Sequence, residues 1–115
     1  GRTVIVQAAP APHPYFHAEK RDIFLDLPIA PWEAALGQTV PVPTLGGTVE
    51  LRIPPGSQTG RKLRLKGRGL PGNPPGDQYA VLKIVTPAAH TDAARAFYER
   101  MARELPMNPR ADLGV

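Results

Sequence analysis

Residues 78–87, QYAVLKIVTP, decide the fold class of this 115-residue chain. In an extended chain the side chains alternate between two faces, and here both faces are fairly apolar. A strand with two apolar faces is covered on both sides, as in the interior of a sheet. We therefore expect residues 78–87 to form the central strand of a β-domain.

Strand-like alternation continues outward from this segment toward the N-terminus. Residues 22–29 (DIFLDLPI) place Ile23, Leu25 and Leu27 on one face, and RKLRLKG alternates leucines with cations. TVPVP and TVELRI are two more strands, joined by TLGG, whose adjacent glycines permit the positive φ of a tight hairpin. Residues 3–7 make a further short strand, and the prolines of AAPAPHP, which follows, indicate a linker or crossover.

Two segments change from strand spacing to helical spacing. Residues 30–38 (APWEAALGQ) have a proline in the first turn and end near Gly37, and we expect Trp32 to anchor this short helix in the core. A second helix begins after Thr91 and is stopped by Pro106. Its apolar stripe comprises Ala94, Phe97, Tyr98, Met101 and Leu105. Such a helix, of about 14 residues, is marginal alone, so the stripe packs either on its own sheet or on a second copy.

These elements predict a mainly β fold: a small, two-sheet, sandwich-like β-domain with one short helix and a C-terminal α-helix. The length suits one domain with attached pieces. The abrupt start, GRTVIVQ, reads as a strand already under way and indicates a piece of a longer protein. No apolar run approaches the roughly 20 residues that a membrane span needs, so we expect no membrane partner.

The residues that usually carry catalysis or hold metals are not arranged for either task. The chain has no cysteine, which excludes disulfides and thiolate zinc sites. His13, His17 and His90 lie in linker-like sequence, and no nucleophile motif accompanies them. The carboxylates are scattered, as expected of a solvated surface. We therefore expect a non-enzymatic protein with no metal and no cofactor.

The positive charge of the chain is concentrated in GRKLRLKGRGLPG, residues 60–72. The chain holds 14 Lys and Arg against 10 Asp and Glu; without the five cations of this segment, nine remain against ten. Three interpretations stay open: a solvated strand face, a docking site for an acidic partner tail, and phosphate contacts with duplex DNA. The cations are Arg61, Lys62, Arg64, Lys66 and Arg68. No aromatic residue interleaves them, which argues against base stacking on single strands.

Long, ordered stretches resemble the second C-terminal β-domain of DnaJ-type J-domain co-chaperones. They are LPIAPWEAALG, PTLGG, IPPGSQTGRKLRLKGRGLP and GDQYAVLKI. The terminal FYERMARELPMNPRADLGV is similar to the C-terminal end of the CbpA subgroup, the bacterial curved-DNA-binding co-chaperones. The resemblance covers nearly everything from residue 13 to residue 115.

The resemblance implies that the full protein carries an N-terminal J domain that stimulates a DnaK-type chaperone. The His-Pro-Asp signature of that domain is absent here, so this chain alone should leave the ATPase rate unchanged. The resemblance implies that the chain binds unfolded client proteins and forms a homodimer. It also implies a stress-response protein of the bacterial cytoplasm, associated with the nucleoid.

The same resemblance suggests boundaries and site residues. Residues 1–12 would end a preceding β-domain, residues 13–87 would form the DnaJ-type β-domain, and residues 88–115 would form the helix and dimerisation tail. The candidate dimerisation residues are Phe97, Tyr98, Met101, Leu105 and Leu113. The candidate client-binding residues are Ile23, Leu25, Val40 and Val42, for which a place in the core is the alternative.

Overall fold

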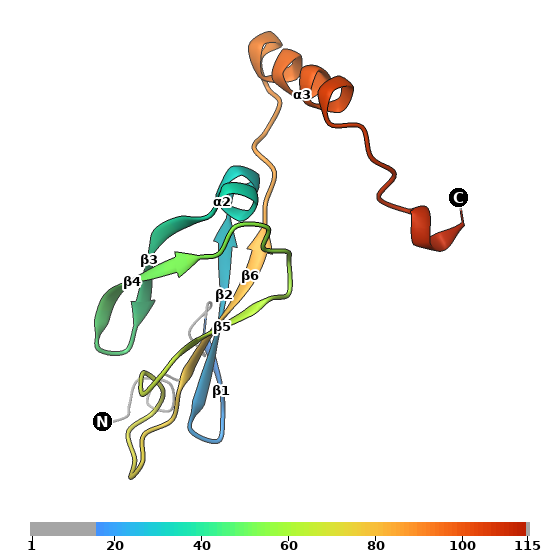
Figure 1. Ribbon diagram of the computed structural model, residues 1–115. Helices are drawn as coiled ribbons and strands as arrows, with labels where there is room; N and C mark the ends of the chain where they lie inside the picture. The colour runs from blue at the N-terminus through green and yellow to red at the C-terminus, as the bar shows by residue number, and fades with distance from the viewer. Residues whose placement is uncertain (1–15, 115) are drawn as a thin grey trace.

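The computed structural model describes residues 16–114 and is mainly β, as predicted (Figure 1). Two sheets are present in this part of the chain. The large sheet has the strand order β1-β2-β6-β5, and the small sheet is the β3–β4 hairpin. The strands are β1 (Phe16–Glu19), β2 (Asp22–Ile29), β3 (Gln38–Thr44), β4 (Gly47–Ile53), β5 (Lys62–Leu65) and β6 (Gln78–Ile84).

Strand β6 is a central strand of the large sheet, which confirms the prediction from its two apolar faces. It pairs in parallel with β2 along its full length, from Gln78 opposite Ile23 to Ile84 opposite Ile29. On its other side it pairs antiparallel with β5. The parallel pairing is possible because the chain passes through a helix, the small sheet and β5 before it returns beside β2.

Strand β1 was not predicted from the sequence. It pairs antiparallel with β2, and Lys20 adopts a positive φ of 59° in the tight turn between them. The strand has only four residues, of which Phe16 alone is buried, so its alternation is too short to stand out. The strand expected at residues 3–7 and the linker after it lie outside the described residues.

The core lies between the two sheets. The inward face of β2 contributes Ile23, Leu25, Leu27 and Ile29, and β6 contributes Ala80 and Leu82. The small sheet adds Val40, Val42 and Ile53. Gln78 is fully buried and donates a hydrogen bond from Nε2 to the carbonyl oxygen of Pro43 (2.9 Å), which ties the large sheet to the small one.

Helix α2 (Pro31–Leu36) begins at the predicted proline and ends at Gly37, which has a φ of 79°. The expectation that Trp32 anchors this helix in the core was wrong: Ala34 is buried, and Trp32 is 55% exposed. Residues two apart on a helix lie roughly 200° apart around its axis. With Ala34 turned inward, Trp32 therefore points away from the core.

Helix α3 (Asp92–Glu104) stands apart from both sheets, at the end of an extended segment (Figure 1). Thr91 caps it as predicted, accepting a hydrogen bond from the amide of Ala94 (3.0 Å). No residue of α3 is buried, so its stripe does not pack on the sheet of its own chain. The tail beyond it holds a 3-10 turn, η1 (Ala111–Leu113). The radius of gyration is 17.8 Å, against about 13 Å for a compact domain of roughly 100 residues.

Candidate functional site: a basic strand and an apolar cleft

The basic segment folds as the alternation of its residues predicts. Leu63 and Leu65 of β5 are half-buried against the core, whereas all five cations of the segment are exposed. Lys62 and Arg64 belong to β5 itself, and Arg61 immediately precedes it. Lys66 and Arg68 lie in the loop between β5 and β6, which we call the glycine-proline loop (residues 66–77).

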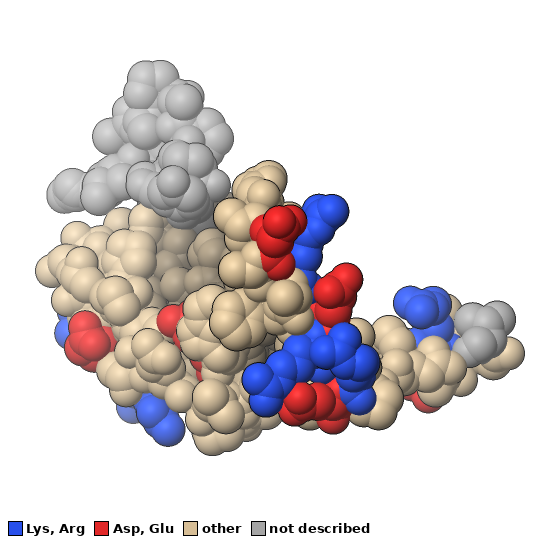
Figure 2. Space-filling view, turned by 90° about the horizontal axis from the view of Figure 1, so that it is seen from above, with Lys and Arg blue, Asp and Glu red and all other residues tan. Residues whose placement is uncertain are grey.

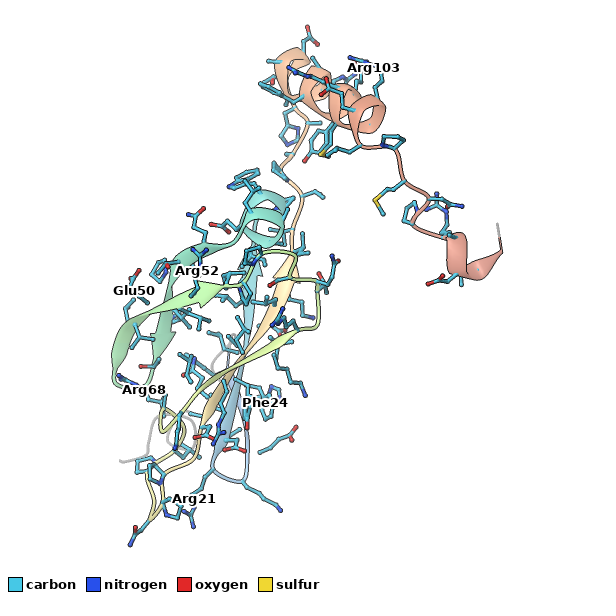
Figure 3. The ribbon with its side chains drawn as sticks, viewed as in Figure 1. Arg21, Phe24, Glu50, Arg52, Arg68 and Arg103 are labelled. Atoms are coloured by element: carbon cyan, nitrogen blue, oxygen red, sulfur yellow. The ribbon has the colours of Figure 1, made fainter. Side chains whose placement is uncertain are left out.

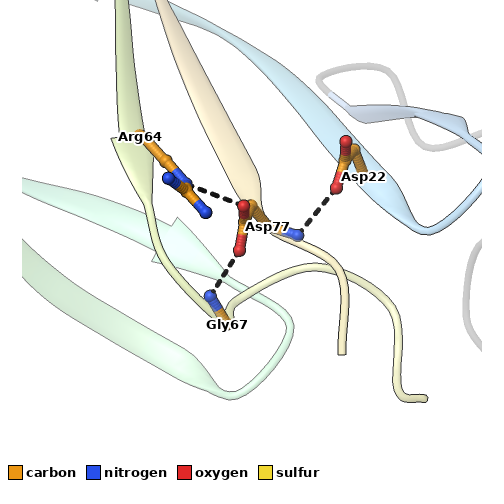
Figure 4. A network of polar contacts seen from close by, with 4 residues as sticks. All are labelled: Asp22, Arg64, Gly67 and Asp77. Carbon is orange, nitrogen blue, oxygen red and sulfur yellow. Dashed lines mark hydrogen bonds and ion pairs between the residues drawn. The ribbon is translucent and has the colours of Figure 1, made fainter. Parts of the chain in front are cut away.

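Arg64 is held by a carboxylate at the start of β6 (Figure 4). Its Nε lies 2.7 Å from Oδ2 of Asp77, and the amide of Gly67 donates to Oδ1 of the same carboxylate (2.8 Å). The hydrogen bond from Gly67, and then the bond to Arg64 and the charges of Arg64 and Lys66, lower the pKa of Asp77, although desolvation opposes them. Arg64 is thus partly neutralised and is a weaker phosphate ligand than its sequence position suggests.

The remaining cations do not form one row. Lys62 reaches over the large sheet, where its Nζ lies 5.4 Å from the ring centroid of Phe24. Arg68 lies instead beside the tip of the β3–β4 hairpin, near Gly46 (Figure 3). The structure therefore brings Lys62 and Arg64 onto one face of the large sheet and directs Arg68 toward another side of the molecule.

Charge is mixed on the face that carries α3. Figure 2 shows lysine and arginine directly beside aspartate and glutamate there, over the part of this face that the structure describes. On α3 itself, Arg100 Nε lies 2.6 Å from Glu104 Oε2. The mixed charge makes this face a poor binding surface for a polyanion, so the basic segment remains the better candidate for a polyanion-binding site.

An apolar cleft of about 430 Å³ lies between the start of α2 and helix α3. Its walls are almost entirely carbon, and the hydroxyl of Tyr98 donates a hydrogen bond to the carbonyl of Pro87, which ties α3 to the preceding segment. The lining residues are Pro31, Trp32, Pro87, Ala88, Ala94, Phe97, Tyr98 and Met101.

Three of the five candidate dimerisation residues, Phe97, Tyr98 and Met101, line this cleft. Leu105 and Leu113 are 67% and 74% exposed but lie outside it. Trp32 is the largest of the cleft residues that were not predicted from the sequence as site residues. Its exposure depends on which side of a six-residue helix turns inward, and no periodicity in so short a segment reveals that.

The candidate client-binding residues occupy the core. Ile23, Leu25, Val40 and Val42 are all at least nine-tenths buried. The structure therefore shows the alternative, a place in the core. In this arrangement these side chains do not line a groove for a client. The exposed apolar surface lies elsewhere, at the α2–α3 end.

The described residues hold no cluster of three or more His, Asp or Glu side chains that could bind a metal ion. His13 lies outside the described residues. Among the helices of residues 16–114, none is long and apolar enough to cross a membrane.

Comparison with protein families matches the model of the DnaJ C-terminal domain to residues 2–87. The chain belongs to the DnaJ C-terminal domain family. Among curated relatives of this DnaJ C-terminal domain, a "Curved DNA-binding protein" of Coxiella burnetii (strain RSA 493 / Nine Mile phase I) is 56% identical over 103 residues, 90% of this chain and 33% of the relative. Proteins of the same name from Pseudomonas syringae pv. tomato and Citrobacter koseri are 48% and 46% identical over 88% and 90% of this chain. The chain spans about a third of the length of these relatives.

Proposed function

We propose that this DnaJ C-terminal domain is a non-enzymatic co-chaperone module that holds unfolded client protein and joins two copies of itself. The observation that supports it most is the set of large apolar side chains that the described residues leave exposed, three of which line the cleft at the α2–α3 end. They are Trp32, Leu36, Val85, Phe97, Met101, Leu105, Met107 and Leu113, each at least 46% exposed. Soluble monomers rarely expose a contiguous apolar patch of more than a few hundred Å², and larger patches mark interaction sites.

Client holding and self-association would both use the α2–α3 end of the molecule. A second copy would cover the cleft and the outer side of α3, and apolar surface that it leaves open would hold an unfolded segment. A single module should bind a client weakly. Linked modules would bind it more tightly, because once one site holds the client the others meet it at a raised effective concentration.

A light-scattering assay with a chemically unfolded client tests the holding activity. We expect an excess of the chain to delay aggregation weakly, and the delay to persist as salt is raised, because apolar burial is not screened by salt. The Trp32→Ser variant should shorten the delay. The Lys83→Gln variant, on the outward face of the large sheet, should not. The chain should leave the ATPase rate of a DnaK-type chaperone unchanged. No delay at any ratio would refute client holding.

Duplex DNA binding is the second candidate function, favoured by the name of the curated relatives and by the concentration of charge in residues 61–68. The cations would contact phosphates without reading bases, because alternate residues of a strand lie roughly 6.5–7 Å apart, a spacing that lets their side chains follow a phosphate backbone. Arg64 contributes least, since Asp77 already holds it.

Salt dependence and a charge variant test this second function. If three or four phosphates are neutralised, log K for a labelled duplex should fall with log salt at a slope of roughly −3 to −4. Replacing Lys62, Lys66 and Arg68 with glutamine should abolish the binding and leave the Tm within a few degrees. The matched control is Lys83→Gln, which removes a cation that already pairs with Asp26 (3.8 Å). Equal binding by the triple variant and the control would contradict the assignment.

A further inference from the structure

Three rings form a ladder across the outward face of the large sheet. His17 of β1 is paired with Phe24 of β2, and Phe24 is paired with Tyr79 of β6, so the three side chains project from the same face. The His17 and Phe24 centroids lie 5.1 Å apart with an interplanar angle of 13°. The Phe24 and Tyr79 centroids lie 5.2 Å apart at 17°. We call these three residues the aromatic ladder.

The aromatic ladder is accessible in the described structure. It stands on the side of the sheet opposite the core, because the neighbouring residues Ile23 and Ala80 point inward and are fully buried. His17 is exposed, and Phe24 and Tyr79 are half-exposed. His17 and Tyr79 are the two ends of the ladder, so each keeps one ring face that no other ring of the ladder covers.

Cations border the ladder. The register of β5 and β6 places Arg64 opposite Tyr79, and Lys62 extends toward the Phe24 ring. The carboxylates of Asp26, Glu19 and Asp77 each lie within 4 Å of a lysine, histidine or arginine nitrogen. Lys62 forms no ion pair with a described carboxylate, so its charge remains available to a ligand.

This arrangement overturns the premise of the sequence argument against base stacking. That argument considered aromatic residues only along the basic strand, where there are none. The sheet instead supplies the ring of Tyr79 from β6, which pairs with β5, and the ring of Phe24 from β2, one strand further away. In the sequence, Phe24 lies 38 residues upstream of Lys62 and Tyr79 lies 17 residues downstream.

We propose that the aromatic ladder and Lys62 bind single-stranded nucleic acid. Proteins that hold single strands combine a cationic path for the backbone with aromatic side chains against which successive bases stack, and four-stranded sheets serve this purpose. Bases of an intact duplex are already stacked and cannot reach such rings. The proposal is therefore separate from duplex binding, and it does not depend on client holding or dimerisation.

Fluorescence anisotropy with a labelled oligothymidine of about 16 nucleotides, and with a duplex of equal length, tests the proposal. The double variant Phe24→Thr/Tyr79→Thr keeps β-forming residues on the strands and should bind the single strand about tenfold or more weakly, because each stacked base contributes substantially. Its duplex affinity should not change. Lys62→Gln should reduce the salt slope for the single strand by about 0.7.

Two controls keep the test independent of folding. Val81→Thr changes the same face of β6 without removing a ring, and should bind as the parent chain does. Titration of the unaltered chain with the oligonucleotide should shift the ring-proton NMR signals of Phe24 and Tyr79. Stationary ring signals, no single-strand binding at low salt, or equal binding by a folded double variant would overturn the proposal. Displacement of the oligonucleotide by an aromatic-rich unfolded peptide, with ring shifts only for the peptide, would assign the face to clients instead.

Discussion

Replacing Gly76 with alanine should lower the Tm by more than about 10 °C. A Cβ atom at this position would lie 1.9 Å from the carbonyl oxygen of Arg21 and 2.4 Å from its carbonyl carbon. Both are backbone atoms, so a side-chain rotation cannot relieve the overlap. The glycine-proline loop would have to lift away from the β1–β2 turn.

That movement would break several hydrogen bonds at once. The amide of Leu70 donates to the Arg21 carbonyl (2.8 Å), and the amide of Asp77 donates to Oδ1 of Asp22 (2.9 Å). Overpacking typically costs about 1–3 kcal/mol and each lost hydrogen bond about 0.5–1.5 kcal/mol. A total near 3 kcal/mol or more is a large share of a small domain's stability, and about 1 kcal/mol shifts the Tm by roughly 4–8 °C.

Gly46→Ala is the matched control, because the nearest atom to a Cβ there is the flexible end of Arg68, at 3.7 Å. Thermal unfolding followed by circular dichroism should show a small change for this variant. A Tm for Gly76→Ala within a few degrees of the parent chain would show that the loop does not pack on the turn as described. Because this loop carries Lys66 and Arg68, the Gly76 variant should also weaken duplex binding.

The fold was largely predictable because its strands are long enough for alternation to be read. β2, β4 and β6 each have seven or eight residues, and the residues predicted to share one face of β2, Ile23, Leu25 and Leu27, are all buried. β1 escaped notice because four residues with one buried side chain carry too little signal. The packing of the glycine-proline loop on the β1–β2 turn could not be predicted either: a Cβ at Gly69 would lie 2.5 Å from the carbonyl oxygen of Arg21, 48 residues upstream.

The candidate sites were less predictable, because each depends on pairing across the chain. The basic strand could be recognised from its charge. The ion pair of Arg64 could not, because its partner Asp77 lies 13 residues downstream. The aromatic ladder requires the register of three strands. The cleft requires the rotation of α2 and the position of α3, neither of which follows from periodicity alone.

Changing Met101 to glutamate should convert a dimer of this chain into monomers, if α3 is the self-association surface that we propose. Met101 lies on the cleft wall beside Phe97 and Tyr98, and it is 46% exposed in the single chain. A carboxylate buried there against a second copy would have no cation opposite it among the apolar cleft residues. Hot spots near the centre of an interface contribute about 2 kcal/mol or more, so at such a position the dissociation constant should rise about 30-fold or more.

Mass by light scattering over a range of concentrations checks this expectation. Ala102→Glu introduces the same charge one residue along the helix, outside the cleft lining, and should remain dimeric. Trp32→Ala should weaken the dimer if the second copy enters the cleft, but not if only the outer side of α3 is used. Removal of residues 106–115 takes away two exposed apolar side chains, Met107 and Leu113, and should also shift the mass toward monomer. A parent chain that stays monomeric at high concentration would contradict the proposal, and the apolar end would then be left to clients alone.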